Sequence, residues 1–121
     1  MTSEYVTCTK DKVKVSYSVY ALLFELGLNP SSKGTIYIKE LIEFIIDNNL
    51  FDTSYQKILD IFIIDKNYQG KPIKENIKSC IRRIDYIKIQ KNFKFIFGFE
   101  FDIYYLTPSK FISLIALLYK D

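Results

Sequence analysis

Apolar residues recur at intervals of three and four over most of the chain, which is the spacing of one face of a helix. Five stretches with this period predict helices, at about residues 18–26 (or from 16), 35–48, 54–64, 72–86 and 108–118. The second stretch has the widest apolar face, so we expect it to lie at the centre and to be packed by several others. The last is apolar enough to be buried or to form a dimer contact.

Residues that are typical of helix ends separate these stretches. Gly27 lies where a C-terminal cap belongs after the first helix, and residues 29–34 form a connector rich in turn residues. The candidate N-terminal caps are Asp52, Thr53 or Ser54 for the third helix and Thr107, followed by Pro108, for the last.

The third and fourth stretches are close together and indicate a helix-turn-helix. An apolar run from Ile61 to Ile64 is followed by a polar break at residues 65–71. Pro72 suits the first turn of a helix, and Gly70 just before it allows a tight turn. Because helix, short break and helix occur in that order, we interpret residues 59–86 as a helix-turn-helix.

The predicted helix over 72–86 has two different faces. At about 100° per residue, counted from Lys71, the positions between about 180° and 280° are apolar: Ile73, Ile77, Cys80, Ile81 and Ile84. The opposite face is charged and mostly basic, with Lys71, Lys74, Glu75, Lys78, Arg82 and Asp85. An ordinary solvated helix face and a face presented to a partner have the same pattern, so both interpretations stay open here.

The segment 87–105 is ambiguous. Isoleucine and phenylalanine alternate with polar residues, which is typical of a strand or of a hairpin with Lys91-Asn92 as its turn. Such a hairpin would make the domain a winged helix. The competing interpretation is a short helix from Asn92 to Phe97, ended by Gly98.

The length of 121 residues indicates a single domain that can bury a core. Residues 1–15 are polar with interspersed valines, and we expect them to be either a frayed tail or a short edge strand. Residues 16–121 are assigned to the helix-turn-helix domain.

Composition places the chain among globular proteins, at 49% hydrophobic and 26% charged residues. The net charge of +3 is modest, so a basic surface patch can arise only if the cations gather on one side of the molecule. Cys8 and Cys80 are far apart and histidine is absent, which indicates a reducing cytoplasm without disulfides or zinc. Neither a signal peptide nor an 18-residue apolar run is present, so no membrane association is expected.

The sequence does not contain the arrangements of acid, base and nucleophile that most enzymes use. There is no histidine, no glycine-rich phosphate loop and no paired carboxylates apart from ordinary helix faces. Glu40, Glu43 and Asp47 share one helix face, which is expected to be a solvated surface and not a metal site. We therefore expect no enzymatic activity, no cofactor, no metal and no small-molecule substrate.

Several landmarks occur in a defined order along the chain. They are Glu25-Leu26-Gly27-Leu28 with Lys33-Gly34, Tyr37-Ile38-Lys39-Glu40-Leu41-Ile42, the helical segments around Asn67, Phe97-Gly98-Phe99 and Thr107-Pro108-Ser109-Lys110-Phe111-Ile112. Over roughly residues 16–120 this order resembles the C-terminal DNA-binding domain of the sporulation master response regulator of endospore-forming bacteria. The resemblance implies an all-α bundle of about six helices around a helix-turn-helix, which binds promoter DNA and pairs with a second copy. It also implies a helix before Gly98, which favours the helical interpretation over the wing.

The sequence departs from that family along the recognition helix. Pro72 and Lys78 stand in place of arginines, and Ser79 in place of a histidine, while Lys74 and Glu75 reverse an acidic-then-basic pair. Because lysine does not reproduce the bidentate contact of arginine with guanine, we expect a different DNA site. The family's phosphorylatable receiver domain is not expected, since too few residues precede the domain, and neither is control by phosphorylation.

Together these features predict a sequence-specific DNA-binding protein, a transcriptional regulator that places helix 72–86 in the major groove and forms a homodimer at least on double-stranded DNA. The residues assigned to DNA contact are Lys71, Lys74, Glu75, Lys78, Ser79, Arg82, Arg83 and Lys88, with Lys33, Lys39, Lys57, Lys66 and Lys91 as further phosphate candidates. Two alternatives remain open. One is a protein-interaction module that pairs with a related regulator, suggested by the aromatic stretch 93–105, and the other is a plasmid or phage DNA-binding accessory protein.

Overall fold

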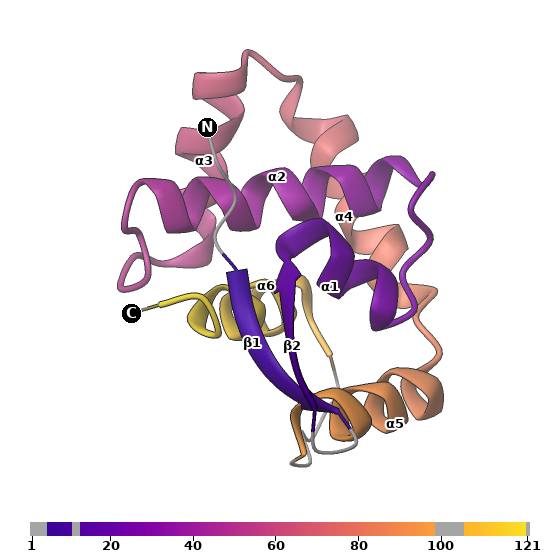
Figure 1. The fold of residues 1–121 in the computed structure, drawn as a ribbon. Coiled ribbons are helices and arrows are strands. Elements are labelled where there is room, and N and C mark those ends of the chain that lie inside the picture. The colour runs from indigo at the N-terminus through magenta and orange to yellow at the C-terminus, as the bar shows by residue number, and fades with distance from the viewer. Residues whose placement is uncertain (1–4, 11–12, 99–105, 121) are drawn as a thin grey trace.

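A computed structural model describes the backbone at residues 5–10, 13–98 and 106–120, and the side chains there except at 8–10 and 13–16. Within this part of the chain, two strands precede six helices (Figure 1). They are β1 (Tyr5–Lys10), β2 (Val13–Ser18), α1 (Val19–Glu25), α2 (Lys33–Asp47), α3 (Tyr55–Lys66), α4 (Gly70–Arg82), α5 (Tyr86–Phe97) and α6 (Pro108–Leu117). The prediction of an all-α bundle of about six helices is confirmed, with a small hairpin added to it.

The two strands form an antiparallel hairpin in which Tyr5 faces Ser18 and Val6 faces Tyr17. Val6 and Tyr17 are buried, and the hydroxyl of Tyr119 donates to the Tyr17 carbonyl at 3.2 Å. β1 also packs against α5, and β2 against α1. Of the two possibilities for the N-terminal residues, the described part is therefore strand, and it is attached to the helical core.

The second helix, α2, is the centre of the molecule, as its wide apolar face predicts. It crosses the middle of the fold and packs against α1, α3, α4 and α6 (Figure 1). Its buried apolar side chains are Ile38, Leu41, Ile42, Phe44 and Ile45. α6 turns Phe111, Ile112 and Ile115 into the same core, so the apolar side of the last helix is used within the chain.

The helix ends follow the local chemistry that the sequence indicates. The side chains of Ser18, Ser54 and Thr107 each accept a hydrogen bond from a backbone N–H in the first turn of the helix that follows. Gly27 and Gly98 have φ angles of 105° and 80°, a left-handed conformation that glycine adopts without strain. None of the described helices is long and apolar enough to cross a membrane.

The segment after α4 is helical from Tyr86 to Phe97, so the winged-helix alternative is wrong over residues 87–97, while residues 99–105 lie outside the described part. The helix is also longer than the short one expected from Asn92. The segment also contains the apolar spacing of a helix. Ile89, Phe93 and Ile96 follow one another at intervals of four and three residues, and all three are buried. Ile87 and Phe95, which complete the alternation, are exposed.

Tyr55, at the start of α3, gives the fold a dependence on alkaline pH. Burial raises the pKa of Tyr55 from 10.0 to about 12. The folded protein therefore holds the phenolic proton that the unfolded chain loses above about pH 10, so this contribution to stability is complete below pH 10 and falls as the pH rises toward 12. We expect urea unfolding to show a smaller loss of stability between about pH 9 and pH 11 for Tyr55→Phe than for the wild type. An equal loss in both proteins would contradict the assignment to Tyr55.

Candidate nucleic-acid interface

A turn of three residues joins α3 to α4. α3 ends at Lys66, and Asn67 adopts the left-handed conformation with φ 56° and ψ 42°. Gln69 occupies the N-cap position of α4, which begins at Gly70, but its side chain makes no capping bond. Asparagine tolerates this conformation better than other residues with a side chain. The tight turn is therefore made by Asn67 and not by Gly70, which was expected to allow it. The arrangement of two helices joined by a short turn agrees with a helix-turn-helix.

Tyr68 fixes this turn to the central helix. Its hydroxyl donates to Glu40 on α2, with distances of 3.0 and 3.2 Å to the two carboxylate oxygens. Its ring makes edge contacts with Tyr37 and Phe62, at centroid distances of 5.5 and 5.9 Å. Desolvation, and then the bond to Glu40, raise the pKa of Tyr68. Sequence reasoning missed this residue because its partner lies 28 positions away.

Removing only the Tyr68 hydroxyl tests how much that hydrogen bond contributes. Tyr68→Phe keeps the ring contacts and removes a bond to a carboxylate, so we expect the free energy of unfolding to fall by about 1–2 kcal/mol. Urea denaturation measures this change. An unaltered midpoint would mean that the rings alone hold the turn.

One side of α4 is anchored in the core. Ile73, Ile77, Cys80 and Ile81 are buried, as the apolar face predicts, and α4 packs against α2 and α6. The contact with α2 is close at Gly34, where an added Cβ would lie 2.5 Å from the carbonyl oxygen of Asn76 and 2.5 Å from Cys80 Cβ. α4 is therefore held at a fixed distance from the central helix.

The other side of α4 is in solvent. We call it the α4 outer face, and its exposed residues are Lys71, Lys74, Glu75, Lys78 and Arg82. Lys74 lies 3.9 Å from Asp60 on α3, but both side chains are about half exposed, so this pair contributes little to stability. Four cations and one carboxylate thus point away from the core.

The remaining predicted contact residues lie elsewhere. Ser79 is half-buried and accepts a hydrogen bond from Arg82 at 3.4 Å, so it orients Arg82. Arg83 is exposed and forms the C-terminal cap of α4. Lys88 belongs to α5, where its aliphatic stem lies near Gly27. The structure therefore brings the first five predicted residues and Arg82 together on one helix and separates Lys88 from them.

The predicted extent of this helix, 72–86, is wrong at both ends. α4 begins at Gly70 and ends at Arg82. It ends early because the Asp85 carboxylate accepts from the backbone N–H groups of Ile87 and Lys88 and so begins a new helix. Asp85 therefore leaves the charged face, and the α4 outer face is more basic than the sequence indicates.

The acidic face of α2 is used within the fold. Glu40 accepts the bond from Tyr68, and Glu43 forms an ion pair of 3.3 Å with Lys39. That pair also occupies one of the lysines that were phosphate candidates. No group of three potential metal ligands is found among the residues that the structure describes.

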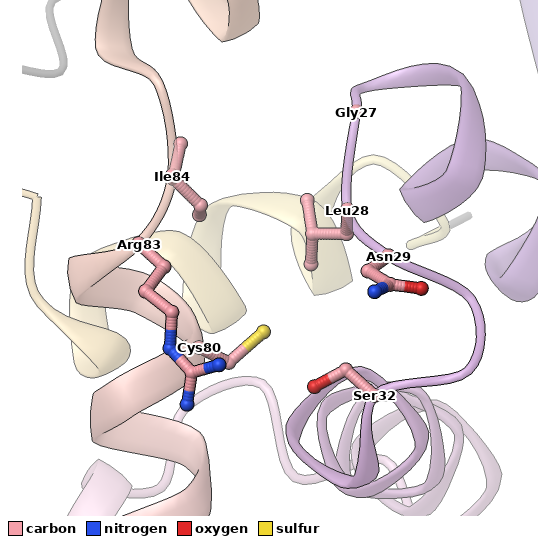
Figure 2. A pocket seen from close by; sticks show the side chains of 7 residues that line it. All are labelled: Gly27, Leu28, Asn29, Ser32, Cys80, Arg83 and Ile84. Carbon is pink, nitrogen blue, oxygen red and sulfur yellow. The ribbon is translucent and has the colours of Figure 1, made fainter.

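A small pocket lies beside the C-terminal end of α4, against the connector between α1 and α2 (Figure 2). It encloses about 170 Å³. Its lining residues are Gly27, Leu28, Asn29, Ser32, Cys80, Arg83 and Ile84. Sequence reasoning did not find this pocket, because it joins two segments about fifty positions apart that share no motif.

The α4 outer face, the turn held by Tyr68 and the pocket at the end of α4 are the features from which a function must be inferred. All three lie on or beside one helix whose other side is buried against α2. Comparison of the chain with protein-family models, with curated proteins and with solved structures gives no match.

Proposed function

We propose that the protein is a sequence-specific DNA-binding protein, a transcriptional regulator that inserts α4 into the major groove. The observation that supports this most is the α4 outer face itself. Lys71, Lys74, Lys78 and Arg82 are all exposed on it, while the isoleucines on the opposite side are buried. A helix presented in this way by a helix-turn-helix fits the width of the major groove.

Each residue of the face has a chemistry suited to DNA. Lysine and arginine donate to phosphate oxygens or to the O6 and N7 atoms of guanine, and Glu75 can accept from the N4 amino group of cytosine. Ser79 holds Arg82 by its 3.4 Å hydrogen bond, which limits the positions of the guanidinium. In this proposal two copies bind adjacent half-sites, as in other helix-turn-helix proteins.

The salt dependence of binding tests this proposal against other kinds of surface. If three or four cations of α4 neutralise phosphates, the logarithm of the association constant for a mixed-sequence duplex should fall against the logarithm of salt concentration with a slope of about −3. Fluorescence anisotropy of a labelled duplex at several salt concentrations gives this slope. Absence of duplex binding at low salt would overturn the proposal.

A protein-interaction module is the second candidate, and specific exposed side chains favour it. Ile64 on α3 and Ile87 on α5 are 79% and 82% exposed, which is unusual for isoleucine. The aromatic stretch that suggested this function is partly core, because Phe93 is buried and Phe95 is exposed. Binding through apolar residues would persist at high salt, so the same salt series separates the two functions.

A plasmid or phage accessory protein would bind DNA through the same face as a transcriptional regulator.

A further inference from the structure

The pocket beside α4 is lined by hydrogen-bond donors that the described part of the fold leaves unused. Arg83 carries up to five N–H groups and forms no ion pair with any described residue. Ser32 precedes α2 as its N-terminal cap, yet its hydroxyl makes no capping bond. Asn29 uses its side-chain oxygen to accept from the Ser31 N–H and hydroxyl, at 3.0 and 2.9 Å, which leaves its amide N–H groups.

These three donors face one another across the pocket. Figure 2 shows the Ser32 hydroxyl and the Asn29 amide nitrogen turned toward the side on which Cys80 and the Arg83 guanidinium lie. None of the seven lining residues is acidic, and Leu28 and Ile84 supply apolar walls. The Cys80 sulfur is already within 3.5 Å of the Thr35 hydroxyl. A cation and neutral donors without a carboxylate select for an anion with several acceptor oxygens.

We propose that this pocket binds an oxyanion of the phosphate class. The guanidinium of Arg83 supplies two parallel N–H donors, which match two oxygens of a tetrahedral phosphate, and Ser32 and Asn29 donate to the others. The volume of about 170 Å³ exceeds several times the roughly 30 Å³ that one water occupies in the liquid, so the group fits. Arg83 and Asn29 are exposed, and the site is therefore open to solvent.

Two sources can supply this group, a free phosphate and a phosphodiester of bound DNA. The second source rests on the proposed function, because Arg83 directly follows α4 and a duplex on the α4 outer face passes nearby. A backbone phosphate held here would fix the position of the duplex along α4 without contributing base recognition.

A titration with inorganic phosphate tests the site without DNA. The ¹⁵N-labelled full chain is followed by amide chemical shifts at constant ionic strength, with chloride as the replaced anion. We expect the amide shifts of Ser32 and Arg83 to saturate as the phosphate concentration rises. The affinity for phosphate should be about tenfold lower for Arg83→Gln, which corresponds to the loss of one charge-assisted contact. The matched control is Lys110→Gln, which removes one positive charge from the exposed side of α6, outside the pocket, and should retain the wild-type affinity. Linear shifts without saturation, or equal weakening by both variants, would overturn the proposal.

A second titration identifies the source. If a mixed-sequence duplex shifts the same two amides and phosphate competes with it, the pocket takes a backbone phosphodiester. If the duplex binds and the pocket still responds to phosphate, it takes a free ion. If no duplex binds, the proposed function fails while the phosphate titration still decides the pocket, so the two failures are distinguishable.

Discussion

Replacing Lys78 and Arg82 together by alanine is expected to abolish a duplex mobility shift and to leave the thermal midpoint nearly unchanged. Both side chains are exposed on the α4 outer face, and neither belongs to the buried isoleucine side. Each lost DNA contact costs about 1–3 kcal/mol, so the two together correspond to roughly a thousandfold weaker binding. The fold loses only solvated charges and one 3.4 Å hydrogen bond between Arg82 and Ser79.

The matched control removes two charges near the C-terminal end of the chain, one on α6 and one just after it. Lys110 and Lys120 are exposed. Lys110 donates to Thr107 through its backbone N–H only, and the Lys120 ammonium lies 5.7 Å from the centroid of the Phe51 ring, an interaction of small energy at an exposed site. Lys110→Ala with Lys120→Ala lowers the net charge equally and should weaken duplex binding far less. Equal weakening by both double variants would show that overall charge, not the α4 outer face, binds the duplex.

Gly34→Ala is expected to destabilise the fold, although it adds only one methyl group. The new methyl would lie 2.5 Å from the Asn76 carbonyl oxygen, which belongs to the backbone of α4 and cannot rotate away. In an unobstructed helix the same change gains about 0.5–1 kcal/mol, whereas overpacking a tight contact costs about 1–3 kcal/mol or more. We expect a net loss of about 2 kcal/mol, or on the order of 8 °C in the thermal midpoint.

Gly70→Ala provides the control for that experiment. Gly70 is also a glycine within a helix. A Cβ added there would lie 3.5 Å from the Ile63 side chain, which is an ordinary van der Waals contact. Thermal unfolding of Gly70→Ala should therefore match or slightly exceed the wild type. If Gly34→Ala behaves like Gly70→Ala, the close contact between α2 and α4 is not rigid.

Much of the fold could be predicted from local signals. The central position of α2 follows from its wide apolar face, and the caps Ser54 and Thr107 follow from side chains that accept backbone N–H groups. The two faces of α4 were also visible in the sequence, because a period of 3.6 residues separates Ile73 and Ile77 from Lys74 and Lys78. These features depend on neighbouring residues only.

The features that sequence reasoning missed depend on contacts between distant residues or on competition between two local signals. Asp85 fits the charged face of α4 by period, yet it caps α5 instead, and periodicity cannot decide between these roles. The bond between Tyr68 and Glu40 joins positions 28 apart. The pocket donors Ser32 and Arg83 come together only because α2 and α4 cross closely at Gly34.

Selection of bound sequences from a random duplex pool measures whether the α4 outer face recognises bases. We expect the wild-type protein to enrich a short motif, and Lys74→Ala with Lys78→Ala to relax the preference at some of its positions. A pool that stays random with the wild-type protein, or a motif that is identical for the variant, would show that these side chains do not recognise bases.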